Sequence, residues 1–145
     1  GSSIAHCPKS NAKFGHGYAP LEKMLDAGIA VGLGSDSVAS NNICDLLEEG
    51  RFASLVARNR ADTERLIAAE EILRMATLGG AQALGMGEEI GSLEPGKQAD
   101  IAIISLSSDA QQPVNEIAAC VVFSSSGRDV LSTIVAGEER YRRTA

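Results

Sequence analysis

Two short apolar runs near the start of the chain predict two strands of a parallel sheet. Residues 4–6 run from Ile to His, and residues 29–33 combine Ile, Val and Leu with small residues. Apolar runs of this length are typical of strands that are buried on both faces. Because a loop and a short helix are predicted between them, the order predicts one βαβ unit.

Prolines and glycines divide the segment between these two strands. Residues 8–20 are rich in Pro, Gly and small polar residues and predict a loop. Pro20 then suits the first position of a helix, where its missing N–H leaves no hydrogen bond unmade. That helix carries apolar residues on one face and ends at Gly28, a residue type that tolerates the left-handed conformation after a helix.

The middle of the chain predicts helices. Residues 43–59 carry Leu, Val and Phe at helical spacing, and residues 58–63 form a charged break. A second helix is predicted over residues 69–78, and we expect Gly79-Gly80 to interrupt it before a short continuation.

After residue 88 the pattern changes to short strands. Pro95-Gly96 marks a turn, and the apolar runs that follow are bounded by polar residues. We therefore divide the chain into two domains, residues 1–88 and residues 89–145. The strands predicted in the second domain are mostly antiparallel and cover residues 99–106, 118–123, 130–136 and 139–141.

Composition narrows the class of protein. The chain has 145 residues, 44% hydrophobic and 22% charged, which excludes a disordered tail or a coiled coil. A net charge of −6 and the lack of a Lys/Arg cluster exclude a nucleic-acid partner. No apolar run is long enough to cross a bilayer, so we expect no membrane partner. Three cysteines, an odd number with wide spacing, predict reduced thiols and a cytoplasmic protein.

Polar residues follow both strands of the predicted parallel pair. His6 ends the first strand, and Asp36 follows the second within Gly-Leu-Gly-Ser-Asp-Ser. Neighbouring strands lie about 5 Å apart and ligands bind at their carboxyl ends, so we expect both side chains to face one pocket. A carboxylate at Asp36 would bind a divalent metal or move a proton, or else cap a turn. His6 is a metal ligand, a substrate contact or a packed core residue, and His16 is exposed or faces a substrate.

Motifs for several other chemistries are missing. The two histidines and three cysteines match no zinc-ligand spacing. The glycines before Asp36 lack the third glycine of a dinucleotide-binding fingerprint, because residue 37 is Ser. The pair Glu48-Glu49 predicts a solvated helix face. A phosphate-binding loop over residues 34–37 is a further alternative.

Four sequence motifs follow one another along the chain. They read H-C-P-K-S-N, G-H-G and A-P within residues 6–20, L-G-S-D-S-V-A-S-N-N at residues 33–42, M-A-T-L-G-G-A-Q-A-L-G at residues 75–85 and I-G-S-L-E-P-G-K-Q-A-D at residues 90–100. In this order they resemble the amidohydrolase superfamily, in its branch of chlorohydrolases, cytosine-deaminase-like enzymes and adenosine-type deaminases.

The resemblance implies an α/β fold that forms the C-terminal part of a (β/α)8 barrel, with its last two strands and helices, plus part of a small β-sandwich. By resemblance, Asp36 is the eighth-strand aspartate, which ligates a divalent metal, zinc or iron, and accepts a proton from the activated water. His6, Asn11 and His16 are expected to bind substrate or to support the site.

The resemblance also implies a reaction. It predicts a hydrolase of non-peptide C–N bonds that releases ammonia from an aminopurine nucleoside or a related N-heterocycle. Ser37 and residues 9–13 favour adenine-like nucleosides, including those of aminofutalosine-type deaminases. Hydrolytic dechlorination of a heteroaromatic ring is the alternative reaction within the same branch.

The sequence departs from the family in one respect that changes this interpretation. The first-strand H-x-H, the fifth-strand His and Glu and the sixth-strand His have no counterpart here, whereas a catalytic metal takes three protein ligands. We therefore expect the C-terminal part of a larger enzyme, inactive alone and partnered by the missing N-terminal part. The alternative is a non-catalytic module that forms homo-oligomers or pairs with another chain through exposed strand edges.

Overall fold

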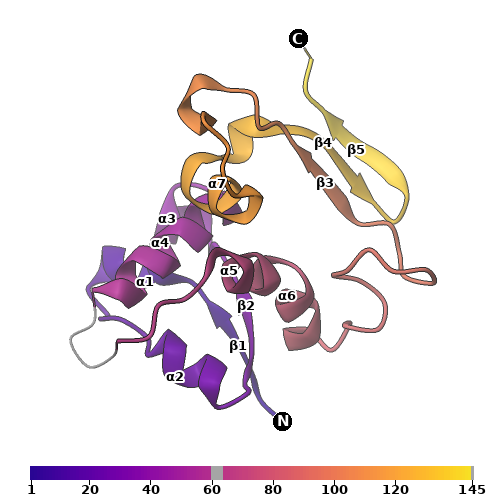
Figure 1. Cartoon of the computed structure of the whole chain (residues 1–145). Helices are drawn as coiled ribbons and strands as arrows, with labels where there is room; N and C mark the ends of the chain where they lie inside the picture. Colours follow the sequence, from indigo (N-terminus) through magenta and orange to yellow (C-terminus); the bar gives the residue numbers. More distant parts are fainter. Residues whose placement is uncertain (60–63, 145) are drawn as a thin grey trace.

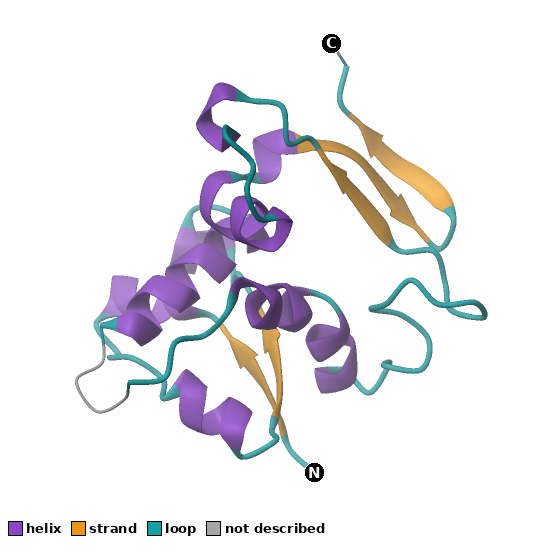
Figure 2. Ribbon diagram, in the orientation of Figure 1, coloured by secondary structure: helices purple, strands orange, loops and turns teal. Residues whose placement is uncertain are grey.

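A parallel pair of strands begins the fold. In this computed structural model, which describes residues 1–59 and 64–144, β1 (Ser3–His6) pairs in parallel with β2 (Ala30–Leu33). The predicted βαβ unit is therefore confirmed. Helices surround this pair, whereas a second sheet lies to one side of it (Figure 1, Figure 2).

The loop predicted over residues 8–20 is wrong in its first half. The segment begins with α1 (Pro8–Phe14), which Pro8 opens and Gly15 closes in a left-handed conformation at φ 68°. Proline and glycine mark the two ends of a helix as readily as they mark a loop, so composition did not separate the two. The predicted helix follows as α2 (Leu21–Asp26).

Four α-helices lie between β2 and β3 in the described residues. They are α3 (Val38–Asn41), α4 (Leu46–Arg58), α5 (Ala69–Ala76) and α6 (Leu78–Ala83). α4 begins later than predicted because the carboxylate of Asp45 caps it, accepting hydrogen bonds from the backbone N–H groups of Leu47 at 3.0 Å and Glu48 at 3.2 Å. The charged break predicted over residues 58–63 lies mostly outside the described residues.

The interruption predicted at Gly79-Gly80 is wrong, because both glycines lie inside α6 and the break falls at Thr77. A Cβ atom added at Gly79 would lie 2.8 Å from the carbonyl oxygen of Val31. A Cβ atom added at Gly32, in β2, would lie 2.7 Å from the Cα of Gly80. These glycines allow α6 to approach the strand closely, and this close approach compensates for their low helix propensity.

The C-terminal part contains an antiparallel sheet in the order β3-β4-β5. Three of the four predicted strands are confirmed, with a tight turn at Ala136-Gly137 between the last two. Their bounds are β3 (Ile101–Ile104), β4 (Val130–Val135) and β5 (Glu138–Arg142).

The strand predicted over residues 118–123 is wrong, because this segment lies in α7 (Ile117–Ser124). The Glu116 carboxylate caps the helix by accepting hydrogen bonds from the N–H groups of Ala118, at 2.8 Å, and Ala119. An uninterrupted apolar run fits a buried helix as well as a buried strand, so its periodicity could not separate them.

The hydrophobic core combines helices from both predicted domains. Val31 and Ile72 are buried in it together with Ala118 and Val122 of α7. α7 thus follows residue 88 in the sequence but packs against α4 and α5. The division into residues 1–88 and 89–145 stays a prediction.

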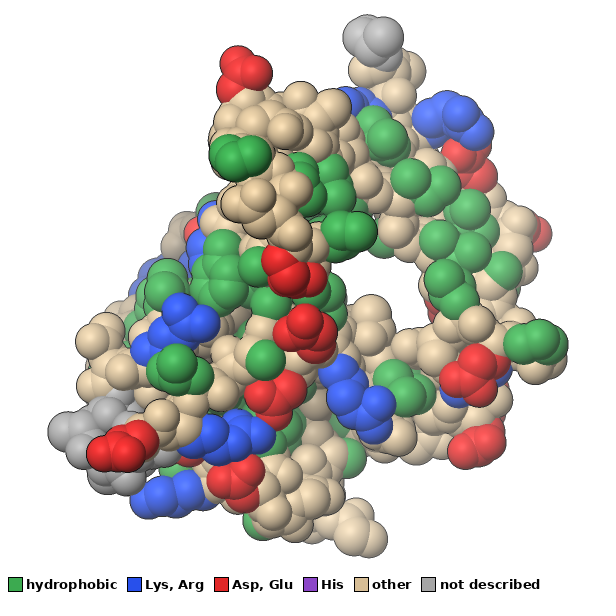
Figure 3. All heavy atoms as spheres, viewed as in Figure 1, with side chains coloured by type: hydrophobic (Ala, Val, Ile, Leu, Met, Phe, Trp, Pro, Cys, Tyr) green, Lys and Arg blue, Asp and Glu red, His purple; other side chains and the backbone are tan. Residues whose placement is uncertain are grey.

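A cavity of about 540 Å³ separates the helices from the sheet, and the space-filling view shows the molecule hollowed there (Figure 3). Its lining is mostly apolar and includes Leu33, Leu47, Leu73, Ile101, Ile104 and Val121. Within residues 1–59 and 64–144, every helix is too short or too polar to traverse a lipid bilayer.

Candidate functional site

The parallel pairing brings the two predicted polar loops together. His6, the last residue of β1, lies opposite Leu33, the last residue of β2, and its carbonyl oxygen accepts a hydrogen bond from the N–H of Gly34 at 2.9 Å. The segment after each strand therefore starts from the same edge of the sheet. This is the edge where α/β proteins bind their ligands.

Asp36 lies on this edge with an exposed carboxylate. Its Oδ2 accepts a hydrogen bond from the Ser10 hydroxyl at 2.7 Å, and its Oδ1 accepts one from the N–H of Ser37 at 2.7 Å. These bonds, with that of Ser10 the strongest, lower the pKa of Asp36 below the ordinary value of an aspartate. The side chain is therefore ionised at neutral pH and presents negative charge outward.

The backbone of Asp36 adopts a conformation that few residues other than glycine adopt. Its φ of 56° lies in the left-handed region, which aspartate tolerates better than most residues. A residue held in such a conformation depends on its surroundings to keep it there. Here the surroundings are α1, which follows β1, and the loop that follows β2.

His6 is buried, with 5% of its surface exposed, and burial lowers the pKa of its imidazole. The ring is therefore neutral at neutral pH, the form that ligates metals or accepts hydrogen bonds. Its buried position agrees with the alternative that His6 is a packed core residue. Its roles as ligand or substrate contact stay predictions.

Among the described residues, the hydrogen-bond donors to the Asp36 carboxylate do not include the other two predicted residues. Asn11 lies in α1 and is half-buried, with its backbone N–H donating to the carbonyl oxygen of Cys7 at 3.2 Å. His16 is exposed beyond α1 and stacks on the ring of Phe14, with centroids 5.7 Å apart. Their expected contact with a substrate stays a prediction.

Sequence reasoning missed two residues behind Asp36. Glu49, predicted on a solvated face, is 0% exposed, and Asn41 is 7% exposed. The amide nitrogen of Asn41 donates both to a carboxylate oxygen of Glu49 and, at 2.7 Å, to the carbonyl oxygen of Ser35. Burial raises the pKa of Glu49. No local signal marks a glutamate in the first turn of a helix as buried, because that position usually favours acidic residues for the helix dipole.

The residues present supply only part of a metal site. The ionised, exposed Asp36 fits one ligand of a divalent cation. Across residues 1–59 and 64–144, however, His, Cys, Asp and Glu side chains form no cluster of three or more that could hold an ion. The described residues therefore supply one ligand of such a site, Asp36.

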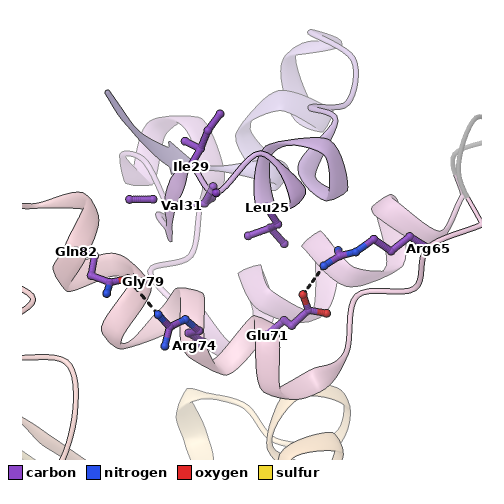
Figure 4. Close-up of a pocket in the computed structure, with 10 residues that line it drawn as sticks. Leu25, Ile29, Val31, Arg65, Glu71, Arg74, Gly79 and Gln82 are labelled. Carbon is purple, nitrogen blue, oxygen red and sulfur yellow. Dashed lines mark hydrogen bonds and ion pairs between the residues drawn. The ribbon is translucent and has the colours of Figure 1, made fainter. Parts of the chain in front are cut away.

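A separate pocket of about 490 Å³ lies at the opposite end of β2. Figure 4 shows Arg74 directed at Gln82, and Arg65 directed at Glu71 on its rim. Because Ile29 and not Leu33 lines this pocket, it is distinct from the edge that carries Asp36.

Comparison with known proteins finds relatives that share one name. A 5-methylthioadenosine/S-adenosylhomocysteine deaminase of Moorella thermoacetica is 42% identical over 135 residues, which are 93% of this chain and 32% of the relative. The protein of the same name from Pyrococcus abyssi is 45% identical over 138 residues, 95% of this chain and 32% of the relative. The chain thus spans about a third of the length of these relatives.

Solved structures agree. An adenosine deaminase from Xanthomonas campestris with bound zinc superposes with a TM-score of 0.92 at 36% identity, over 97% of this chain and 32% of that one. An atrazine chlorohydrolase from Arthrobacter aurescens in complex with zinc superposes with a TM-score of 0.88 at 34% identity, over 97% of this chain and 31% of that one.

The sequence model of the amidohydrolase family matches residues 1–140. The resemblance seen in the four motifs is therefore confirmed over almost the whole length. The chain belongs to the amidohydrolase family.

Proposed function

We propose that this chain is the C-terminal part of a (β/α)8-barrel amidohydrolase, in which β1 and β2 are the last two barrel strands and β3, β4 and β5 form part of a β-sandwich. Two observations support this. The described residues leave the outer edges of β1 and β2 unpaired, and the chain spans only 32% of its relatives. Its partner is then the remainder of the barrel, on a longer polypeptide.

The proposed reaction is the hydrolytic deamination of an amino-substituted N-heterocycle, such as an adenine nucleoside. Relatives named as deaminases of 5-methylthioadenosine and S-adenosylhomocysteine, of adenosine and of guanine support it. Hydrolytic dechlorination is the second candidate, since an atrazine chlorohydrolase superposes over 97% of the chain.

The observation that carries the proposal is the ionised carboxylate of Asp36 at the carboxyl edge of a parallel strand pair. A divalent metal, zinc or iron, would supply an activated water at neutral pH when bound. Asp36 would hold that metal together with ligands from the rest of the barrel. Its carboxylate would accept a proton as water attacks the ring carbon, and would pass it to the departing amine as the C–N bond breaks.

Ser10 and Ser37 would orient this carboxylate. Each donates one hydrogen bond to a different oxygen of Asp36, and the carboxylate stays exposed, so it can still accept a cation or a proton. The neutral imidazole of His6, on the neighbouring strand end, would border the same pocket.

Substitution of Asp36 in the longer enzyme tests the proposal. We expect Asp36→Asn to lower kcat for ammonia release from adenosine or 5-methylthioadenosine by at least about 100-fold, the low end for loss of a proton-transfer group. Asp109→Asn, which changes an exposed aspartate of the 3-10 helix Asp109–Gln111, is the matched control and leaves kcat unchanged. Full activity of Asp36→Asn would overturn the assignment.

The chain alone offers a second test. We expect the purified 145-residue protein to be inactive and to hold no stoichiometric metal, since the described residues include no three-ligand cluster. One tightly held zinc or iron per chain, measured by elemental analysis, would contradict the proposed division of the site. Chloride release from a chlorotriazine without deamination would favour the second candidate reaction.

An alternative is the non-catalytic module that forms homo-oligomers or pairs with another chain. The unpaired strand edges fit it as well. Deaminase activity of the longer protein that is lost in Asp36→Asn would exclude it. A cytoplasmic location and the lack of nucleic-acid or membrane partners stay predictions from composition.

A further inference from the structure

Glu49 is a fully buried carboxylate close to the candidate site but outside it. It lies in the first turn of α4 and is 0% exposed. Burying a carboxylate is unfavourable unless hydrogen bonds compensate, so such a residue is expected to have a specific task. Its neighbour Glu48 has the same charge and lies half-buried, paired with the Lys9 ammonium at 2.7 Å.

One oxygen of Glu49 reaches the loop that follows β2. Oε1 accepts a hydrogen bond from the Asn41 amide, whose nitrogen also donates to the carbonyl oxygen of Ser35 at 2.7 Å. Both hydrogens of that amide are therefore used. Ser35 directly precedes Asp36, so the contact holds the peptide from which Asp36 starts.

The other oxygen reaches the segment that follows β1. Oε2 accepts a hydrogen bond from the backbone N–H of Lys9 at 3.4 Å. The next residue is Ser10, whose hydroxyl donates to Oδ2 of Asp36 at 2.7 Å. Each oxygen of Glu49 is thus connected, through one peptide unit, to a group that orients Asp36.

Asp36 needs this kind of support. It is exposed and keeps a left-handed φ of 56°, and the hydrogen-bond donors of its carboxylate come from α1 and from the loop that follows β2. A shift of α1 relative to the loop after β2 would change the carboxylate's direction without unfolding the protein.

We propose that Glu49 is a positioning residue for Asp36: its buried carboxylate joins the segments after β1 and β2 and so sets the direction of the Asp36 side chain. The inference rests on the proposed function, in which Asp36 ligates a metal. It adds that α4 supports the geometry of the site, because its Glu49 contacts Asn41, the last residue of α3.

The test compares Glu49→Gln with Glu48→Gln in the longer enzyme. Glutamine at 49 keeps the size but turns one hydrogen-bond acceptor into a donor that faces an N–H group. Glu48→Gln makes the same chemical change at the adjacent residue, whose carboxylate pairs with the Lys9 ammonium at 2.7 Å. Both proteins are loaded with cobalt(II), whose visible absorption depends on ligand geometry.

We expect Glu49→Gln to change the cobalt spectrum and to lower kcat at least about tenfold, while KM changes less, because misplacement of a catalytic group by about 1 Å has effects of this order. Glu48→Gln keeps both the spectrum and kcat. A folded Glu49→Gln protein with the wild-type spectrum and kcat would overturn the inference.

Two further arms keep the result interpretable. If Glu49→Gln does not fold, Asn41→Ala is measured instead and is held to the same two outcomes. It removes the amide that joins Glu49 to Ser35 and leaves the contact of Glu49 with the Lys9 N–H in place. If the wild-type enzyme gives no cobalt absorption, or Asp36→Asn keeps full activity, the proposed function itself fails. If the wild-type enzyme gives cobalt absorption but the Glu49 or Asn41 variant has the same spectrum and kcat as wild type, the positioning role is rejected and the proposed function stands.

Discussion

The helical core and the three-stranded sheet use the same apolar residue types in opposite ways. Val31 and Ile72 are 3% and 1% exposed in the core. Ile103 of β3 and Val135 of β4 are 45% and 43% exposed, and apolar side chains gather over the sheet in the space-filling view (Figure 3). Among the described residues, the core cluster includes none from β3, β4 or β5.

The helical core is therefore packed within the described chain, whereas the sheet β3-β4-β5 has an apolar face on which no other layer of the described residues packs closely. A sheet with an apolar face is stable when another layer packs on it. The helices cover β1 and β2, but the cavity of about 540 Å³ separates them from β3. This pattern supports the proposal that the rest of a longer polypeptide packs there.

The largest expected effect lies in the core. Ile72→Ala removes a fully buried side chain of α5 and should lower the free energy of unfolding by about 2–5 kcal/mol, because it leaves a cavity. Urea denaturation followed by circular dichroism measures it. A loss below about 1 kcal/mol would mean that this cluster is not the stabilising core.

The close approach of β2 and α6 predicts a smaller loss in the free energy of unfolding. Gly32→Ala places a methyl group 2.7 Å from the Cα of Gly80 and should cost about 1–3 kcal/mol by overpacking. Gly137→Asn is the contrasting variant in the sheet, since φ is 80° there and no atom lies within 4 Å of the added Cβ. Asparagine tolerates that conformation, so its unfolding curve should barely move. Equal losses at both sites would contradict the contrast in packing.

The exposed sheet predicts a smaller effect again. Ile103→Ser should change the free energy of unfolding of this chain by no more than about 0.5 kcal/mol, as is typical for surface positions. It should also reduce self-association, because it removes part of an apolar face. Denaturation and light scattering check the two outcomes. A loss comparable to that of Ile72→Ala would show that the sheet is packed in the same way as the core.

The smallest expected effects concern two carboxyl groups, one in each region. Ser10 donates to Asp36 at 2.7 Å and Ser132 donates to Glu139 at 2.6 Å, and each bond is the main cause that lowers the pKa of its acceptor. Ser10→Ala and Ser132→Ala should therefore raise the pKa of Asp36 and of Glu139, respectively, toward ordinary values. Carbon NMR of the carboxyl groups across the acid range measures both.

The sign of the accompanying stability change follows from the direction of these shifts. A carboxyl group with a lowered pKa in the folded state stabilises the fold above its ordinary pKa, and this contribution is lost as the pH falls through the folded value. The serine variants should therefore flatten the acid limb of the stability profile. An unchanged Asp36 titration in Ser10→Ala would show that this hydrogen bond is not what holds the carboxylate.

Local signals predicted much of the order of elements. β1, β2 and their parallel pairing followed from short apolar runs separated by a helix, and β4 and β5 followed from runs bounded by a glycine turn. Two predictions were wrong for different reasons. Pro8 and Gly15 delimit a helix that composition presented as a loop, and residues 118–123 form a helix because their partners are α4 and α5.

The order of residues alone places Asp36 directly after an apolar strand. Wherever that strand pairs in parallel with a neighbour, Asp36 lies at the carboxyl edge of the sheet. The burial of Glu49, the second contact of the Asn41 amide and the return of α7 to the helices are of another kind. Glu49 and α7 meet groups many residues away, and even the Asn41 contacts, six and eight residues apart, depend on how the loop and α4 pack, which no short sequence pattern encodes. The amino acids thus specified where the carboxylate stands, and long-range packing specified what surrounds and orients it.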